Sequence, residues 1–342
     1  MKIHIPLLVT ILAIFGSAAV AQPTQVMSQP GAQLEAWHKA MSRTPLPRQG
    51  CFESDYPSTG WREVSCMTAT PLLDLPARGP RLYTVGAGTD FSAHVSGLIS
   101  SAIGSFPSVT GVTSESDSGG AANTYTLQLN TNFFSTSVCS GHAGCQGWQQ
   151  FAYRNSGSNS QVWMEYWLAN YGATCPATWA SDNNGNCVKD SLATIVPVQT
   201  LANLANLSLT GTVVSGGTDT VMISTGSGHV SATGQDSVLN LAQGWNTAEY
   251  NIFGTGGGSQ ANFNSGSTIV VRISLVDGSP AAPTCPGNDN TGETNSLTLV
   301  NPCCSIGGTS PGIMFTESSA AGAKPQFCLD NSIVPVISLL LE

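Results

Sequence analysis

Charged side chains are scarce in this chain of 342 residues. Asp, Glu, Lys and Arg make up 9% of it. Helical bundles and coiled coils need periodic runs of Lys, Glu, Arg, Ala and Leu, which this sequence lacks, so those architectures are excluded. Hydrophobic residues make up 41%, which is enough to bury a sizeable core and which argues against disorder.

Basic residues are especially few after residue 82. Residues 83–342 hold four of them against fifteen acids, a balance of −11, whereas residues 23–82 hold six against five. A protein that binds nucleic acid neutralises phosphates with a basic surface, so nucleic acid is excluded as a partner. There is no CxxC spacing, and His94 and His229 have no carboxylate near them in the sequence. We therefore expect no metal site and no cofactor.

No hydrophobic run is long enough to span a membrane. Residues 1–21 combine a basic start, an apolar run from Ile5 to Phe15 and small residues at the end, a pattern typical of a secretory signal peptide. A spanning helix needs about 20 apolar residues, and the run at 332–341 is shorter still. We expect a secreted, extracellular protein without a stable membrane span, whose mature chain begins near Gln22.

Ten cysteines in a secreted chain indicate disulfide bonds. The adjacent Cys303 and Cys304 would form a strained ring with each other, so we expect one of them to bond to Cys285 and the other to Cys328. The spacings favour three further, local pairs: Cys51 with Cys66, Cys139 with Cys145, and Cys175 with Cys187.

Short alternating segments separated by Gly, Ser and Asn turns begin at about residue 83. Many short strands with no helical period between them predict an all-β, antiparallel sandwich or barrel over residues 83–342. The sequence contains no repeat of fixed length, so a propeller or a solenoid is not expected. Strands are expected at 125–129, 148–153, 161–168, 194–198, 207–214, 220–224, 247–253, 268–275, 296–299 and 313–316.

Residues 22–82 differ from the rest of the chain. They contain Pro, Arg and a Cys-bounded loop with little alternation, and a short helix is expected at 34–41. The stretch is either a leader or pro-segment that is removed, or a permanent, small disulfide-bearing extension. We hypothesise that its positive charge covers an acidic groove at neutral pH and that it loosens as carboxylates become protonated.

Two carboxyl groups stand out because they lie in apolar strands, Glu165 and Glu249. Side chains alternate across a strand, so Trp163 and Trp167 share the face of Glu165, and Trp245 shares that of Glu249. By the same rule, Gln146 lies beside Trp148. Strands that each present one carboxyl or amide group among aromatic residues predict a groove for an extended polymer. The alternative is that these are hydrogen-bonded polar residues on the wetter face of a sheet.

The stretch QGWQQFAY at 146–153, followed by QVWMEY at 161–166, resembles the core motif of the glutamic peptidases, or eqolisins. A second stretch, NTAEY at 246–250, resembles the segment of that family that carries the catalytic Glu. Further upstream, GSFPSV at 104–109 is similar to the early strand of the family. The order and the approximate separation of the motifs agree with the family over roughly residues 83–280.

The resemblance implies a two-sheet, concanavalin-like jelly-roll sandwich in which Gln146 and Glu249 face each other across a concave sheet. Glu249 would act as a general base on water and then as an acid toward the leaving amine, because desolvation raises the pKa of a carboxyl. Gln146 would stabilise the oxyanion. The protein would be a monomeric, acid-acting endopeptidase that binds polypeptide through Trp148, Trp163, Glu165, Trp167, Trp245 and Tyr250.

Two other functions fit the same residues. A glycosidase would use Glu165 and Glu249 as its acid and nucleophile, with the carboxyls about 5.5 Å apart, or about 6.5 to 9.5 Å apart with room for a water. In a glycosidase, Gln146 would point away from the site. A non-catalytic carbohydrate-binding or adhesion module would instead stack sugar rings on the Trp-lined face, with polysaccharide as its partner.

Overall fold

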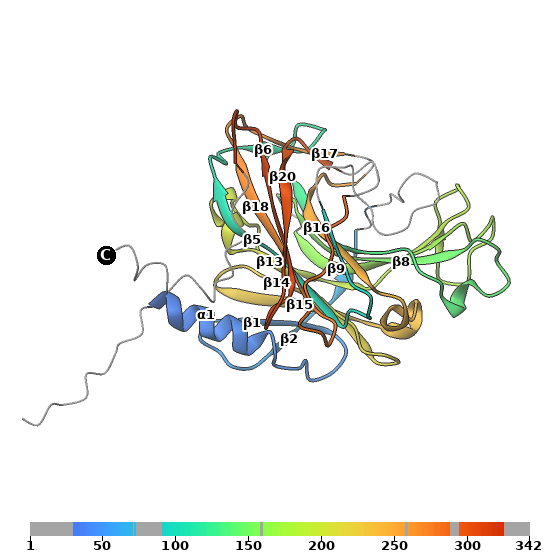
Figure 1. Ribbon diagram of the computed structural model, residues 1–342. Coiled ribbons are helices and arrows are strands. Elements are labelled where there is room, and N and C mark those ends of the chain that lie inside the picture. The colour runs from blue at the N-terminus through green and yellow to red at the C-terminus, as the bar shows by residue number, and fades with distance from the viewer. Residues whose placement is uncertain are drawn as a thin grey trace, which may run out of the picture.

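The computed structural model describes residues 30–70, 72, 91–157, 160–256, 259–287 and 294–324. The predicted signal peptide and Cys328 lie outside these residues. The described chain consists mainly of antiparallel strands (Figure 1), which confirms the all-β sandwich. No helix in the described ranges has the length and hydropathy needed to cross a membrane.

The first large sheet has the strand order β2-β1-β15-β14-β13-β5-β18-β21-β20, in which all neighbours are antiparallel. Its strands are β2 (Arg62–Val64), β1 (Cys51–Asp55), β15 (Gly228–Gln235), β14 (Thr218–Ser224), β13 (Ser208–Thr212), β5 (Ser101–Thr110), β18 (Thr268–Val276), β21 (Gly312–Ser318) and β20 (Thr298–Ile306).

The second large sheet has the order β10-β11-β9-β8-β7-β16-β4, and β12 pairs with both β9 and β3. Its strands are β10 (Ala180–Ser181), β11 (Cys187–Asp190), β9 (Gln161–Ala169), β8 (Gln146–Asn155), β7 (Tyr125–Thr131), β16 (Thr247–Phe253), β4 (Ser92–His94), β12 (Leu192–Ile195) and β3 (Met67–Thr68).

Short elements complete the described chain. A small sheet joins β19, β17 and β6. The helices are one α-helix and four 3-10 turns. These elements are β19 (Thr294–Asn295), β17 (Gln260–Phe263), β6 (Glu115–Ser116), α1 (Pro30–Met41), η1 (Ser137–Cys139), η2 (Leu201–Asn206), η3 (Asp236–Val238) and η4 (Leu241–Gln243).

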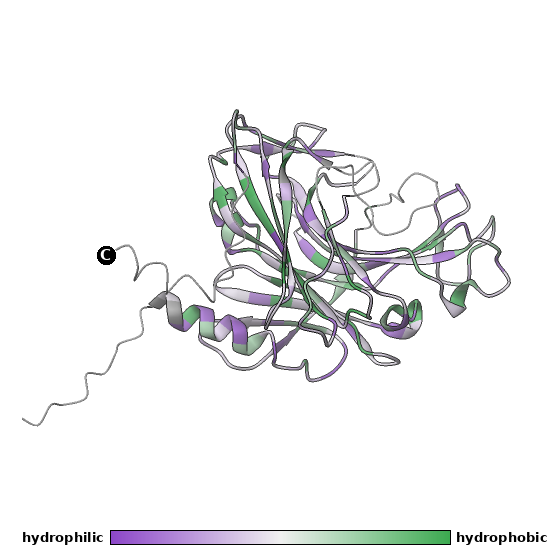
Figure 2. Ribbon diagram, viewed as in Figure 1, coloured by the Kyte–Doolittle hydropathy of each residue, from purple (hydrophilic) through white to green (hydrophobic). Residues whose placement is uncertain are grey.

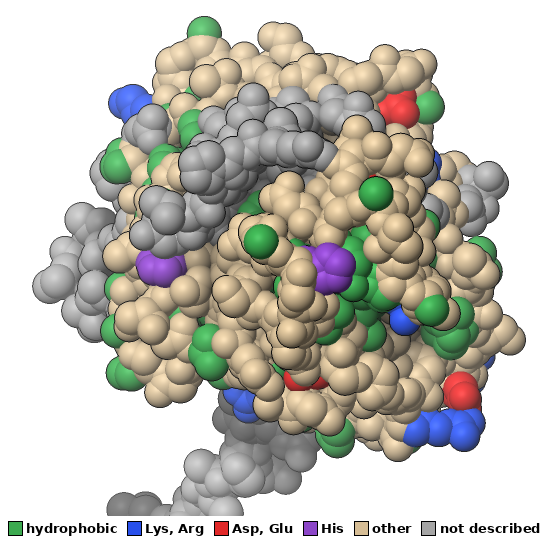
Figure 3. Space-filling view, turned by 90° about the vertical axis from the view of Figure 1, so that its right-hand side faces the viewer, with side chains coloured by type: hydrophobic (Ala, Val, Ile, Leu, Met, Phe, Trp, Pro, Cys, Tyr) green, Lys and Arg blue, Asp and Glu red, His purple; other side chains and the backbone are tan. Residues whose placement is uncertain are grey.

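The main core lies between the two large sheets. Strand alternation places Met164 and Tyr166 of β9 on the inner face, where they join Leu209 and Ile223 of the first sheet in one buried cluster. Figure 2 shows hydrophobic and hydrophilic positions alternating along the strands. On the face of the molecule in Figure 3, charged side chains are few and scattered, as the composition predicts.

Most of the expected strands are present. The expected strand at 247–253 coincides with β16, and the expected helix at 34–41 lies within α1. The sequence pattern missed β15 because its sequence, GHVSATGQ, alternates small and polar side chains rather than large apolar ones. Tertiary pairing with β14 and β1 makes it a strand despite this weak local preference.

Four disulfides join described cysteines, and three of them confirm the local pairs. The fourth shows that, of the two adjacent cysteines, Cys303 is the one bonded to Cys285. Cys304 is also disulfide-bonded. The disulfides lie at the N-terminal extension, at the loops around β8 to β11 and beside β20. They are compatible with an extracellular location.

The described residues before residue 73, here called the N-terminal arm, contact both large sheets. Strand β1 of the arm extends the first sheet by pairing with β15, and β3 pairs with β12 at the second sheet. Helix α1 lies beside β1 and β2 at the lower edge of the molecule in Figure 1. The arm is therefore built into the sandwich, and its removal stays a prediction.

A carboxyl group is buried between the sheets. Asp219 of β14 has no exposed surface, and it accepts a hydrogen bond from the Val214 N–H at 3.3 Å. Burial, reinforced by the nearby Asp236, raises the pKa of Asp219 to about 8. Burial likewise raises the pKa of Glu115 to about 8. Both groups favour the protonated form in the folded protein.

The stability of the fold is therefore expected to fall as the pH rises from 4 to 8. The unfolded chain releases these protons near pH 4 whereas the folded chain retains them up to about pH 8, so each rise in pH within this window favours unfolding. Thermal unfolding should show a Tm at pH 8 at least about 5 °C below that at pH 4. Asp219→Asn, which resembles the protonated carboxyl, should reduce this difference, and an unchanged difference would contradict the assignment.

Candidate functional site

A row of polar side chains crosses the outer face of the second sheet. Strand register places Glu249 of β16 opposite Asn130 of β7, Asn130 opposite Gln150 of β8, Gln150 opposite Glu165 of β9, and Glu165 opposite Asp190 of β11. The first four side chains are at most 1% exposed. We call these five residues the polar row. Five strands thus bring amide and carboxyl groups to one line on this face of the sheet.

Hydrogen bonds connect one end of the polar row. The Asn130 Nδ2 donates to Glu249 Oε2 at 3.1 Å, and the Gln150 Nε2 donates to Asn130 Oδ1 at 3.0 Å. The Gln150 Nε2 also donates to Gln128 Oε1 at 2.6 Å. The Gln150 Oε1 is buried without a partner among the described residues. Asn130 therefore links the Gln150 amide directly to the Glu249 carboxyl.

The other end of the row is a pair of carboxyls. Glu165 has no exposed surface and lies in register with Asp190. Burial raises the pKa of Asp190 to about 6, and hydrogen bonds with Glu165 and Trp163 oppose part of this rise. This end of the row therefore favours holding a proton.

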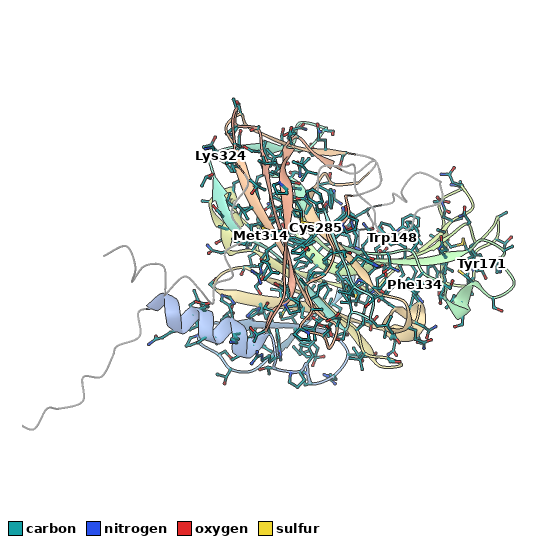
Figure 4. The ribbon with its side chains drawn as sticks, in the orientation of Figure 1. Phe134, Trp148, Tyr171, Cys285, Met314 and Lys324 are labelled. Atoms are coloured by element: carbon teal, nitrogen blue, oxygen red, sulfur yellow. A yellow bond between two sulfur atoms is a disulfide. The ribbon has the colours of Figure 1, made fainter. Side chains whose placement is uncertain are left out.

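Indole rings border the polar row, as the alternation predicted. The Trp167 Nε1 donates to Glu165 Oε1 at 2.9 Å. Trp148 packs with Trp167 and stacks on Phe133, with ring centroids 5.6 Å apart. Figure 4 labels Trp148 between the sandwich and the outlying Tyr171. Trp163 lies in a separate cluster with residues of the N-terminal arm. The three buried indole rings thus surround the Glu165 end of the row.

The N-terminal arm lies on the Glu165 end of the row. The Leu72 N–H donates to Glu165 Oε2 at 2.8 Å, and the Thr70 N–H donates to Gln161 Oε1 at 3.2 Å. The Leu72 side chain is buried against Trp163. A Cβ added at Gly256 would lie 2.3 Å from the Leu72 carbonyl oxygen, so Leu72 also reaches the loop after β16. Two main-chain amides of the arm thus bind side-chain acceptors of β9.

The structure does not bring Gln146 and Glu249 together. Gln146 is half-buried at the start of β8, where it pairs with Ala169 at the end of β9. It lies four residues from Gln150, or about 13 Å along a strand. Gln150 is the residue in register with Asn130 and hence with Glu249. Both glutamines share one face of β8, so alternation could not distinguish them; only the pairing register does.

Trp245 and Tyr250 do not line the outer face and belong to the main core. Tyr250 follows Glu249 directly, so it points to the opposite side of β16. There its ring packs on Phe106, with centroids 5.1 Å apart, and over Gly104. Trp245 precedes β16 and follows η4, so strand alternation does not apply to it. Its ring instead lies 5.5 Å from that of Phe151.

Sequence reasoning missed Asn130, Gln128, Gln161 and Asp190. In β7 the pattern TLQLNT places Gln128 and Asn130 two residues apart among apolar side chains, which is the signal that singled out Glu165. Gln128 and Asn130 escaped notice because no aromatic side chain shares their face of β7, whereas aromatic neighbours mark Glu165, Glu249 and Gln146. Asp190 follows the Cys175 to Cys187 loop, and only its pairing with β9 shows its place.

Comparisons with known proteins give two similar solved structures. One is scytalido-glutamic peptidase with a peptide-based transition-state analog, at 14% identity, over 66% of this chain and 96% of that chain, with a TM-score of 0.32. The other is SCP-B, a member of the eqolisin family of peptidases, in a complex with the tripeptide Ala-Ile-His. It is 11% identical over 67% of this chain and 96% of that chain, with a TM-score of 0.30. No family model and no curated protein matches the chain.

Proposed function

We propose that this protein is a secreted, acid-acting endopeptidase in which Glu249 activates water and Gln150 polarises the scissile carbonyl. The observation that carries the proposal is the hydrogen-bonded series Glu249, Asn130 and Gln150 on the sheet face that binds main-chain amides of the arm. A general base and an amide donor held on one sheet face and connected through Asn130 are the groups that peptide hydrolysis needs.

In the proposed reaction, the Glu249 carboxylate takes a proton from a water molecule whose oxygen attacks the carbonyl carbon of the peptide. The carbonyl π bond opens, and the oxygen that gains its electrons accepts a hydrogen bond from the Gln150 amide. Glu249 then gives its proton to the amide nitrogen as the C–N bond breaks. Glu249 returns to its ionised form, and the products are a carboxylic acid and an amine.

Asn130 couples the two groups in this proposal. With Glu249 ionised, Asn130 donates to the carboxylate and accepts from Gln150, as the structure has it. With Glu249 protonated, a half-turn of the Asn130 amide lets it accept from Glu249 and donate to Gln150 Oε1. The Gln150 amide turns as well, so that its Nε2 takes the position in which the Oε1 had no partner. Such a turn is accessible because terminal amide torsions have broad minima. The donor is thus presented as the proton arrives on Glu249.

The arm favours polypeptide over polysaccharide as the substrate. Glu165 and Gln161 accept hydrogen bonds from amide N–H groups two residues apart in the arm, and a peptide substrate offers the same donors. Glu165 and Glu249 are three strands apart, about 14 Å between backbones at the usual strand spacing, which is wide for the carboxyl pair of a glycosidase. Trp148 and Trp167 pack against Phe133 and Val188, which limits their use as platforms for sugar rings.

Digestion of a denatured protein at about pH 4 tests the proposal. The purified full chain, preincubated in acid, should produce peptides in the presence of a metal chelator and of an inhibitor of aspartic peptidases. Parallel incubations with polysaccharides should produce no sugar fragments. A folded chain that cleaves no protein between pH 3 and 6, or one whose cleavage stops with either inhibitor, would overturn the proposal; binding to polysaccharide without cleavage would favour the non-catalytic module.

A further inference from the structure

Two histidines far from the polar row are hydrogen-bonded to each other. His38 lies on α1 of the arm, and His229 lies on β15 of the first sheet, where it is 1% exposed. The His38 Nδ1 and the His229 Nε2 are 3.0 Å apart. Trp37, also on α1, packs on His229 with ring centroids 4.8 Å apart. The histidine pair therefore joins the helix of the arm to the body of the sandwich.

The partners of the pair fix its protonation. The His38 Nε2 lies 2.7 Å from the Gly226 carbonyl oxygen, which can only accept, so this nitrogen carries a proton. In the neutral ring the His38 Nδ1 is then an acceptor, and the His229 Nε2 must donate to it. The His229 Nδ1 in turn accepts from the Ser224 hydroxyl at 2.7 Å. All three hydrogen bonds are satisfied when both imidazoles are neutral.

The docked pair accommodates one additional proton at most. When the pair binds one additional proton, a single N–H still lies between the two rings, so the hydrogen bond between His38 and His229 is kept. A second proton places two N–H groups and two positive charges against each other at 3.0 Å. The burial of His229, with His38 beside it, lowers the pKa of His229 to about 4. Undocked histidines each take a proton near pH 6.5, so undocking takes up at least one proton in acid.

In the part of the chain that the structure describes, no carboxylate forms an ion pair with His38 or His229 that would compensate for this charge. Among the described residues, the imidazoles of His38 and His229 hydrogen-bond only to each other, to Gly226 and to Ser224. The ionisable groups on the elements packed around the pair are Glu35 and Lys39 on α1, Glu53 and Asp55 on β1, Tyr56 after it, Arg62 on β2 in an ion pair with Glu53, Glu63 on β2 in an ion pair with Arg48, and Asp219 on β14.

We propose that the pair of His38 and His229 is an acid-sensitive latch that holds α1 on the first sheet at neutral pH and releases it in acid. Met41 of α1 covers Ser54 of β1, which lies in register with His229. The same arm continues to Leu72 on the polar row. Release of α1 thus detaches the first part of the N-terminal arm, whose last described residue lies on the polar row. This consequence at the site rests on the proposed function; release of the helix does not.

Hydrogen exchange of the full chain tests the latch, measured in a Glu249→Gln background so that self-cleavage cannot contribute. With rates corrected for the intrinsic effect of pH, protection of the α1 peptide should fall at least about tenfold between pH 6.5 and 4. Gln at position 38 has a hydrogen-bond acceptor and a donor but does not titrate. In His38→Gln, the logarithm of the protection factor should therefore fall by about half as much as in the wild type. His142→Gln, in the Cys139 to Cys145 loop, should leave the fall unchanged.

An α1 peptide whose protection is constant down to pH 4 would overturn the latch, and so would an equal fall in His38→Gln. These outcomes are independent of the proposed function. Helix release in a protein without peptidase activity leaves the latch standing, and peptidase activity in a protein whose helix stays docked leaves the proposed function standing.

Discussion

Replacing Glu249 by Gln is expected to lower kcat for peptide cleavage by at least about a thousandfold at every pH. The amide cannot take a proton from water or give one to the leaving nitrogen, so both general-base and general-acid contributions are lost. The side chain keeps its shape and its place opposite Asn130 on β16, so Tm should change little. The measurement is the steady-state cleavage rate of a fluorogenic peptide from pH 3 to 7.

Glu115→Gln is the matched control for this substitution. Glu115 is also buried, and it accepts a hydrogen bond from the Thr124 N–H at 2.8 Å, but it lies on β6, outside the polar row. Burial raises its pKa to about 8, so the neutral amide resembles the state that it has in acid. The kcat of the Glu115→Gln variant should match that of the wild type. Loss of activity in both variants would indicate a general intolerance of buried Glu substitution.

Gln150→Ala is expected to lower kcat by about 10² to 10³, with a small effect on KM. The lost amide donor acts on charge that develops in the transition state, and a single donor of this kind commonly contributes this much. Gln146→Ala, on the same face of the same strand, should stay within about threefold of the wild type, because Gln146 lies opposite Ala169 at the far end of β8. Stopped assays with the same peptide at pH 4 measure both.

A larger loss of kcat in Gln146→Ala than in Gln150→Ala would contradict the proposed site. It would mean that the amide in register with Asn130 is not the one that stabilises the transition state. Gln150→Glu adds a second test. It keeps the size of the side chain but replaces the amide donor with a carboxyl in register with Glu165 and Asn130. Activity should therefore survive only at the acid end of the profile, where the new carboxyl is protonated and can donate.

Alternation within a single strand correctly predicted which side chains of β9 share a face. Trp163, Glu165 and Trp167 lie together on the outer face because their spacing of two is a local property of any strand. The same reasoning failed at Trp245, which precedes its strand. For Tyr250 it was the resemblance that was wrong: alternation places this side chain on the face of β16 opposite Glu249, where it lies in the core.

Pairing register could not be predicted from the sequence, because it depends on contacts between segments far apart in the chain. The choice between Gln146 and Gln150 is a matter of four residues of register between β8 and β7. The roles of Asn130 and Asp190 likewise become visible only when neighbouring strands are aligned. The contact of Leu72 with Glu165 joins residues 93 positions apart, and no local pattern encodes it.

Strand β1 also has a protective role that any trimming of the chain would remove. It pairs along five residues of β15, and β2 lies outside it. A chain cut after residue 66 would leave β15 as the border of the first sheet, with a run of main-chain N–H and C=O groups open to any other extended segment. The trimmed protein would then tend to associate edge to edge with copies of itself, so β1 and β2 shield an edge that is otherwise open to strand pairing.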